Sequence, residues 1–194
     1  SKGADDGRTN CAWATDCIEP CLAHNSGMLA LPSSSIARIW KTALYWGARD
    51  LFDELLDSEL SAFVKRCAHN GTRPVVRLDG GSDLGLARQW VDRYDMIEFM
   101  DYTKSHKRAW DQLKPSNWSV CLSYDGRQDT IPAYDRFLEW GGTVAVVFDA
   151  TPARKGRPGS PLPATWYGWP VFDGDAHDYL PADIPGTVRG LRFK

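Results

Sequence analysis

The first half of the chain carries apolar residues at helical spacing. Between residues 33 and 70 they recur every three or four positions, the period of an amphipathic helix. The serines at 33–35 can cap a first helix that Gly47 ends or bends. Asp50 can cap a second helix that closes at Asn70 and Gly71. We therefore predict two long helices in this region.

From residue 72 onward, short apolar segments alternate with helical patterns. Four strands are predicted, beginning near Pro74, Met96, Trp118 and Thr143. Helices are predicted between them at Ser82–Val91, Ser105–Leu113 and Thr130–Trp140. Strands that recur about every 20–25 residues with helices between them are typical of parallel βα units. The predicted fold class is α/β, with parallel βα units forming a partial TIM-type barrel, an N-terminal cysteine loop and two helices.

These patterns predict a single domain over residues 1–194. Its parts are an extended arm at 1–10, a cysteine loop at 11–27, helices at 33–70, βα repeats at 72–149 and a loop-rich C-terminal part at 150–194. Residues 187–193 could add a final strand. The region 150–164 is expected to be a loop because Pro, Gly and basic residues interrupt the βα rhythm there.

Composition and charge limit the kinds of molecule that the protein is expected to bind. Hydrophobic content of 43% and a charged fraction of 25% are ordinary for a globular domain. No apolar run approaches the roughly 18 residues that a membrane span needs, so we expect no membrane partner. A formal net charge of −2 gives no reason to expect a broad basic face for nucleic acid. Local binding through Arg154, Lys155 and Arg157 stays open.

Cys11, Cys17 and Cys21 give the strongest chemical signal because three of the five cysteines fall within eleven positions. A disulfide framework is disfavoured by the odd cysteine count, the chain length and the lack of a recognisable secretion signal. Those features favour a reducing cytoplasm. Converging thiolates suit zinc or an iron–sulfur cluster. Zinc would need His24 as a fourth ligand, whereas three cysteines can hold a [4Fe–4S] cluster with one open iron.

The other cysteines and two of the histidines have less specific patterns. Cys67 lies at helical spacing from apolar neighbours and Cys121 lies inside an apolar strand, so both are predicted to be buried core thiols. His69 follows the second helix and His106 begins a polar helix, and both are expected to face solvent.

Polar residues follow every predicted strand, where parallel βα folds bind their ligands. The candidate catalytic residues are Asp79, Asp83, Asp101 and Lys104. The candidate cofactor-binding residues are Arg77, Gly80, Gly81 and Ser82. Two glycines let a ligand approach the backbone, and a helix N-terminus can take an anion. The alternatives are a tight turn with a capping serine, and an ion pair between Asp101 and Lys104.

A second acidic group lies near the C-terminus, where Asp173, Asp175 and Asp178 surround His177. Such a group could hold a divalent metal, and a Mg²⁺-dependent hydrolase is our third hypothesis. The segment lacks the spacing and the closing glutamate of a calcium loop. A capped turn is therefore the preferred interpretation.

Several segments taken in order resemble a family of bacteriophage proteins related to the phage gene product 88 domain. They are the C-x₅-C-x₃-C-L pattern of residues 11–22 with Gly27, and the segments 76–83, 99–105, 144–148 and 172–175. The resemblance runs from Cys11 to the C-terminus and implies no particular activity. It implies the host bacterial cytoplasm as the location.

The cysteine loop followed by βα units is also similar, more distantly, to radical S-adenosylmethionine enzymes. Those enzymes hold a [4Fe–4S] cluster with three cysteines at the top of a partial barrel, and a glycine-rich turn helps to hold the cofactor. Gly80 and Gly81 are suitably placed for that role. The cysteine spacing differs from the usual C-x₃-C-x₂-C, and no apolar strand precedes Cys11.

Our leading hypothesis is an iron–sulfur phage protein of open activity, with Cys11, Cys17 and Cys21 as ligands. If it is an enzyme, the resemblance implies S-adenosylmethionine as cofactor and an unidentified small molecule as substrate. The alternative is a non-enzymatic protein that binds a host factor or nucleic acid and uses zinc or a cluster structurally. Under the first hypothesis the cysteine loop faces a pocket that includes Asp79 or Asp83 together with Lys104.

Overall fold

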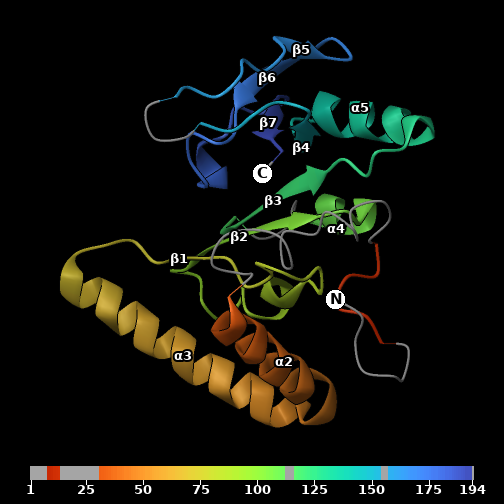
Figure 1. Ribbon diagram of the computed structural model, residues 1–194. Helices are drawn as coiled ribbons and strands as arrows, with labels where there is room; N and C mark the ends of the chain where they lie inside the picture. Colours follow the sequence, from red (N-terminus) through yellow and green to blue (C-terminus); the bar gives the residue numbers. More distant parts are fainter. Residues whose placement is uncertain (1–7, 14–30, 112–115, 154–156, 194) are drawn as a thin grey trace.

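The computed structural model describes residues 8–13, 31–111, 116–153 and 157–193 (Figure 1). These residues form a mixed α/β fold with a seven-stranded, mostly parallel sheet and four α-helices. Cys17 and Cys21 lie outside the described residues, as do Arg154 and Lys155 of the basic loop. Within the described residues, no helix has the length and apolar character needed to cross a membrane.

The sheet has the strand order β1-β2-β3-β4-β7-β6-β5. The strands are β1 (Val75–Val76), β2 (Glu98–Thr103), β3 (Trp118–Ser123), β4 (Thr143–Phe148), β5 (Thr165–Trp166), β6 (Trp169–Asp173) and β7 (Val188–Arg192). The first four are parallel neighbours in chain order, which confirms the predicted βα progression. β7 confirms the final strand, pairing in parallel with β4 and with β6.

The helices are α2 (Pro32–Gly47), α3 (Arg49–Asn70), α4 (His106–Asp111) and α5 (Ile131–Glu139). Both long helices were predicted within two residues of these bounds. The predicted serine cap of α2 is wrong, because Leu31 occupies the N-cap and Pro32 begins the helix without a side-chain cap. Gly71 ends α3 as predicted, with a φ of 65° that favours glycine.

One face of the sheet is covered by helices. Phe99, Trp118 and Val120 pack with Leu60 of α3 and with Trp90 and Val91 of the 84–94 segment. Farther along the same face, Leu122, Val144 and Val188 pack with Tyr134, Phe137 and Leu138 of α5. This face holds most of the buried apolar side chains of the described residues, so it supplies most of the hydrophobic stabilisation.

The opposite face carries a smaller core that includes polar groups. Cys121, Ala145 and Leu180 pack there with Met100, Tyr102 and Leu191. Arg189 is fully buried beside them and pairs with Asp183 at 2.5 Å. Cys121 and Cys67 are both buried, as predicted. Burial raises the pKa of the Cys121 thiol, so this side chain stays neutral at physiological pH.

Two predictions of local structure are wrong. Residues 82–91 were expected to be an α-helix, but only a short 3₁₀ turn forms at Leu86–Gln89. Gly85 precedes it with a φ of 73°, a left-handed conformation that cannot belong to an α-helix. The loop-rich C-terminal part also contains the unpredicted strands β5 and β6. They are joined by Tyr167 and Gly168, which both have positive φ, as a type I′ hairpin turn requires.

Candidate functional site

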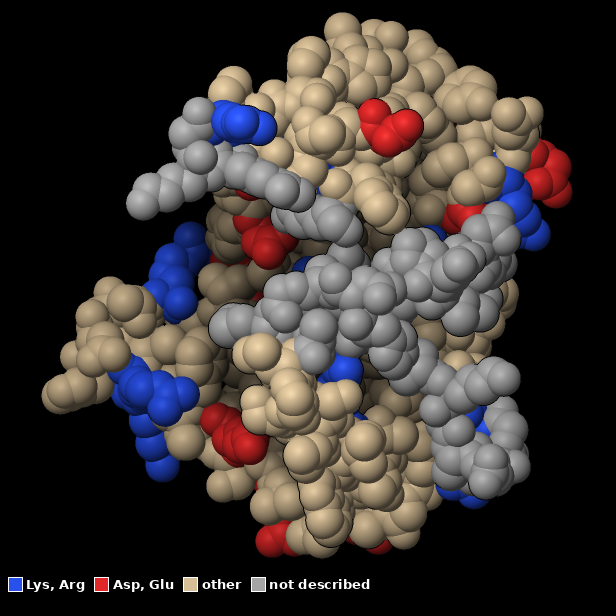
Figure 2. Space-filling model, in the orientation of Figure 1, with Lys and Arg blue, Asp and Glu red and all other residues tan. Residues whose placement is uncertain are grey.

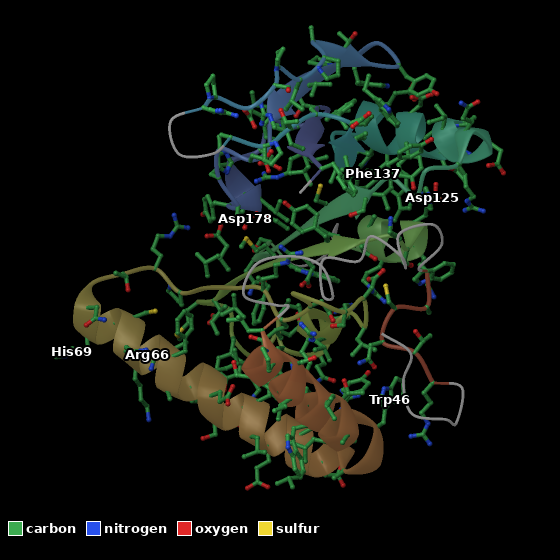
Figure 3. The ribbon with its side chains drawn as sticks, in the orientation of Figure 1. Trp46, Arg66, His69, Asp125, Phe137 and Asp178 are labelled. Atoms are coloured by element: carbon green, nitrogen blue, oxygen red, sulfur yellow. The ribbon has the colours of Figure 1, made fainter. Side chains whose placement is uncertain are left out.

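The arm of residues 8–13 is anchored at the carboxyl edge of the first strands. Asn10 is buried, and its side chain donates to Thr42 Oγ1 at 2.8 Å and accepts from Trp46 Nε1 at 2.7 Å. Its carbonyl oxygen accepts a hydrogen bond of 2.7 Å from the amide of Asp83. Figure 3 shows Trp46 on α2, on the same side of the molecule as this arm. Asn10 therefore links α2 to the turn that follows β1.

Cys11 directly follows Asn10, so the first cysteine lies next to the Asp83 turn. It is partly exposed, and its amide donates to Thr9 Oγ1 at 3.2 Å. Within the described residues no group of three or more potential metal ligands converges. Cys17 and Cys21, the other two predicted ligands, lie outside those residues. Of the three predicted ligands, the structure therefore describes the surroundings of Cys11 alone.

Asp79, a predicted catalytic residue, has a structural role. Its carboxylate accepts hydrogen bonds from the amides of Leu84, Gly85 and Leu86 at 2.7–3.1 Å. Ser82 Oγ also donates to it, at 2.5 Å. The carboxylate thereby caps the 3₁₀ turn, a role that the sequence assigned to Ser82 itself. Because four donors already occupy Asp79, little of its capacity is left for a ligand.

Asp83, also a predicted catalytic residue, ties the first turn to the end of β2. It accepts from Thr103 Oγ1 at 2.8 Å and from the amide of Lys104 at 3.1 Å. It also forms an ion pair with Arg108, which sequence reasoning had not singled out. Asp83 is buried, and the side chain of Arg108 is only 20% exposed. This network holds the turn that receives the arm.

Lys104 and Asp101 do not form the ion pair considered from the sequence. Lys104 Nζ donates instead to the carbonyl oxygen of Tyr124 at 3.1 Å, which joins the ends of β2 and β3. Asp101 shares a sheet face with Phe99, so it lies on the helix-covered side. Its carboxylate accepts from Trp118 Nε1 at 3.1 Å and, at 3.4 Å, from the amide of Asp79.

Asp101 has the most unusual acidity of these carboxyl groups. Burial raises its pKa to about 7, and the nearby charge of Asp79 adds to the rise. The hydrogen bonds from Trp118 and Asp79 and the charge of Arg77 oppose the shift without cancelling it. A carboxyl group with this pKa exchanges protons near neutrality, a property that is common at functional sites.

The predicted cofactor-binding residues border the same turn. Gly80 and Gly81 are exposed, and a Cβ placed on Gly80 would meet no atom within 4 Å. The glycine there is therefore not required by local packing. Arg77 stacks on Tyr102, with its guanidinium carbon 4.4 Å from the ring centre. Its buried Nε has no hydrogen-bond partner, so the described structure leaves a polar donor unused at this edge.

His106 was expected to face solvent, and this expectation is wrong. The ring is partly buried, 4.8 Å from the ring of Tyr134, and its buried Nδ1 has no hydrogen-bond partner among the described residues. Burial lowers the pKa of His106, although the charge of Asp125 partly opposes the shift. Tyr134 of α5 packs against the ring, and nothing in the polar sequence around His106 signals this contact. His69 is exposed, as expected.

Asp125 follows β3 at the same edge and was likewise not singled out. Burial by itself would raise its pKa, but hydrogen bonds from Arg127 and Thr130 outweigh that effect and lower it. The amide of Asp125 donates to the hydroxyl of Tyr134 at 3.1 Å. Figure 3 shows Asp125 on the side of the molecule where α4 and α5 meet the sheet. These contacts make it a structural carboxylate.

The C-terminal acidic group is explained by an ion pair. Arg192 NH1 contacts Asp173 at 2.7 Å and Asp175 at 3.1 Å. The amide of Asp175 also donates to Asp173 at 3.1 Å, so a turn closes over these residues. The arrangement agrees with the preferred turn interpretation and leaves the hydrolase hypothesis without a geometric argument. Figure 2 shows acidic and basic side chains interspersed on the visible face.

The comparisons with known proteins give one match. A family model described as Gene product 88 matches residues 2–193, nearly the whole chain. No curated protein and no solved structure matches the chain.

Proposed function

The chain belongs to the Gene product 88 family of phage proteins, and we propose that it holds an iron–sulfur cluster through Cys11, Cys17 and Cys21. The observation that carries the proposal is the hydrogen bond between the Asp83 amide and the Asn10 carbonyl. That contact fixes the start of the cysteine loop at the carboxyl edge of parallel strands, where α/β folds bind their ligands.

The donor set fits such a cluster. Several thiolates on one short loop are the ligands that iron–sulfur clusters require. Cys11 is partly exposed rather than packed into the core, unlike Cys67 and Cys121. A cluster bound by three cysteines has one open iron, which can bind a substrate or a cofactor such as S-adenosylmethionine.

The chain's own residues define what surrounds the start of this loop. Asp79 and Asp83 shape the turn and fix the arm, so we assign them positioning roles and no longer catalytic ones. Arg77 and Lys104 lie at these strand ends beside Arg108, which is paired with Asp83, and Arg77 Nε lacks a hydrogen-bond partner among the described residues. An anionic group of a bound small molecule would find its counter-charge there. β1–β4 follow chain order beneath helices on one face, which supports the finer proposal of a partial barrel.

The experiment that tests the proposal is anaerobic purification followed by metal analysis. We expect a brown protein with broad visible absorption and about four iron and four sulfide per chain. The Cys121→Ser variant, which alters a buried thiol on the opposite sheet face, should keep that content. A colourless protein without iron after cluster reconstitution would refute the proposal.

A second function rests on a different observation. α2 buries none of its residues, and Ile36, Ile39 and Trp40 are 57–67% exposed. A non-enzymatic phage protein that docks on a host protein would present such apolar side chains. In that protein the cysteine loop would hold structural zinc. One zinc per chain, with no iron and no visible colour, would favour this function.

A further inference from the structure

The sheet ends at β1, which has a neighbour on one side only. The amide of Glu98 donates to the carbonyl oxygen of Pro74, and Val75 is opposite Glu98 in the parallel ladder. In this geometry the backbone groups of Val76 face β2, while those of Val75 and Arg77 point away from the sheet. No contact within the described residues satisfies these outward groups.

A groove of about 580 Å³ lies beside this open edge. Its volume falls within the range of ligand pockets. The lining comes from α3 and from the segment of β1, and most of it is apolar: Leu56, Leu60, Ala62, Phe63, Val75, Val76 and Leu78. Proteins protect an edge strand from unwanted strand pairing by keeping it short or charged, and β1 is short. That protection does not require an apolar groove beside the strand. The combination of open backbone groups with an apolar groove is the geometry that accepts an added strand.

The charge of the groove indicates what kind of strand would fit. Arg66, Arg77 and Glu59 line it, and within the described residues neither arginine forms an ion pair. The guanidinium of Arg77 lies over Tyr102, on the sheet face opposite α3. Arg73, at the start of the same edge, already pairs with Glu98 at 3.1 Å, so it adds no unpaired charge. Figure 3 shows Arg66 near the C-terminal end of α3, on the opposite side of the view from the arm. A second copy of this edge would bring like charges together, whereas an acidic segment would meet opposite charges.

We propose that the β1 edge binds an extended segment of a partner protein in which apolar residues alternate with acidic ones. The segment adds a strand to the sheet through the backbone of Val75 and Arg77. Its apolar side chains enter the groove over α3. Its carboxylates alternate with them and point to the opposite sheet face, where the guanidinium of Arg77 lies over Tyr102. This inference shares Arg77 with the proposed function, but it needs neither the cysteine loop nor a bound metal.

The first test uses a fluorescein-labelled peptide of alternating valine and glutamate with the full-length protein. We expect saturable binding by fluorescence anisotropy, about three- to tenfold tighter than for a matched valine–lysine peptide. Equal binding of the two peptides, or no binding of either, would refute an acidic partner. Dimerisation of the protein alone in sedimentation experiments, abolished by a block at Val75, would identify a second copy as the occupant and overturn the proposal.

The second test alters the edge and the groove separately. Val75→Pro removes one outward N–H while leaving the ladder to β2 intact, and we expect about fivefold weaker peptide binding. Ala62→Glu places a bulky acidic side chain in the groove from an exposed helix position and should abolish binding. Ala68→Glu, on the same helix outside the groove, is its matched control and should bind normally. Normal binding by Ala62→Glu would exclude the groove.

Hydrogen exchange distinguishes peptide binding at the β1 edge from peptide binding elsewhere on the protein. When the peptide binds, exchange of the Val75 and Arg77 amides should slow, because both gain hydrogen-bond partners. The Val76 amide already bonds to β2, so its exchange should change little. Binding without protection of Val75 and Arg77 would show that no strand is added and would overturn the proposal.

Discussion

The amide of Asp83 donates a hydrogen bond of 2.7 Å to the carbonyl oxygen of Asn10, across 73 positions of sequence. Asp83 is fixed in turn by Arg108, Thr103 and the amide of Lys104. The first residues of the arm are therefore held by the same network that shapes the end of β2. Any metal or cofactor bound by Cys11, the next residue, would therefore lie near the carboxyl edge of the first strands.

The first prediction concerns the Asn10 anchor. Asn10→Ala removes hydrogen bonds to Thr42 and Trp46 and leaves the partly buried indole N–H of Trp46 without its acceptor. We expect a loss of about 2 kcal/mol in the free energy of unfolding, measured by urea denaturation. In metal-free protein, alkylation of Cys11 should also become faster. Thr9→Ala, at an exposed position in the same arm, is the control, and equal stability of the two variants would contradict the anchoring role.

The second prediction concerns the proposed ligands. A cluster that the unfolded chain cannot hold contributes its binding free energy to folding. Cys17→Ala should therefore lose metal and lower the melting temperature of the holoprotein. Cys121→Ser should keep its metal, whatever its effect on packing. Full metal content in Cys17→Ala would show that the ligand assignment is wrong.

The third prediction follows from the raised pKa of Asp101, about 7 in the folded protein against 3.8 for an ordinary aspartate. Between these values the folded protein binds more protons than the unfolded chain, so stability falls as pH rises. The fall should amount to roughly 2–4 kcal/mol between about pH 4 and pH 8. Asp101→Asn keeps an acceptor for Trp118 and should remove this fall.

Urea denaturation across that pH range provides the measurement. Asp92→Asn, at an exposed position in a nearby turn, serves as the control and should leave the pH dependence unchanged. If Asp101→Asn showed the same pH dependence as the wild-type protein, burial of this carboxyl group would not be its cause.

The regular part of the fold follows from the sequence because burial and periodicity agree there. β3 and β4 begin and end at the predicted residues, Trp118–Ser123 and Thr143–Phe148. β4 is a continuously apolar segment and β3 is a mainly apolar one, and both lie in the middle of the sheet, so no competing pattern obscures them. α3 was equally clear, because its apolar stripe ends at a glycine that can adopt positive φ.

The rest depends on contacts that local patterns do not encode. The apolar residues of 84–91 have helical spacing, yet Gly85 and the Asp79 carboxylate give the segment a different hydrogen-bonding scheme. The end of β6 was interpreted as a turn because Pro170 and the aspartates around residue 173 are typical of turns. Asp79, Asp83 and Lys104, predicted as site residues, lie at the carboxyl edge of the first strands, and their role in a site stays a prediction. The buried Asn10 was missed because a single asparagine in a polar arm has no periodic signal.

The last prediction concerns the buried ion pair of Arg189 and Asp183, whose side chains are 0% and 2% exposed. Arg189 also donates to the carbonyl oxygen of Gly174 at 3.0 Å, and in the part of the chain that the structure describes Asp183 Oδ2 accepts no hydrogen bond. Arg189→Met would leave the Asp183 carboxylate buried without a counter-charge, which typically costs about 3–5 kcal/mol. The double variant Arg189→Met/Asp183→Leu removes both charges and should recover most of that loss.

The pH dependence of Arg189→Met separates this explanation from simple loss of packing. Burial already raises the pKa of Asp183 even though Arg189 opposes the shift, so removing the arginine should raise that pKa further. An acid with a raised pKa stabilises the fold at low pH and loses that contribution as pH rises. Arg189→Met should therefore be closer to wild-type stability at pH 5 than at pH 8 in urea denaturation, whereas the double variant should show no such difference. An equal deficit of Arg189→Met at both pH values would mean that packing of the arginine stem, and not the unpaired carboxylate, sets the cost.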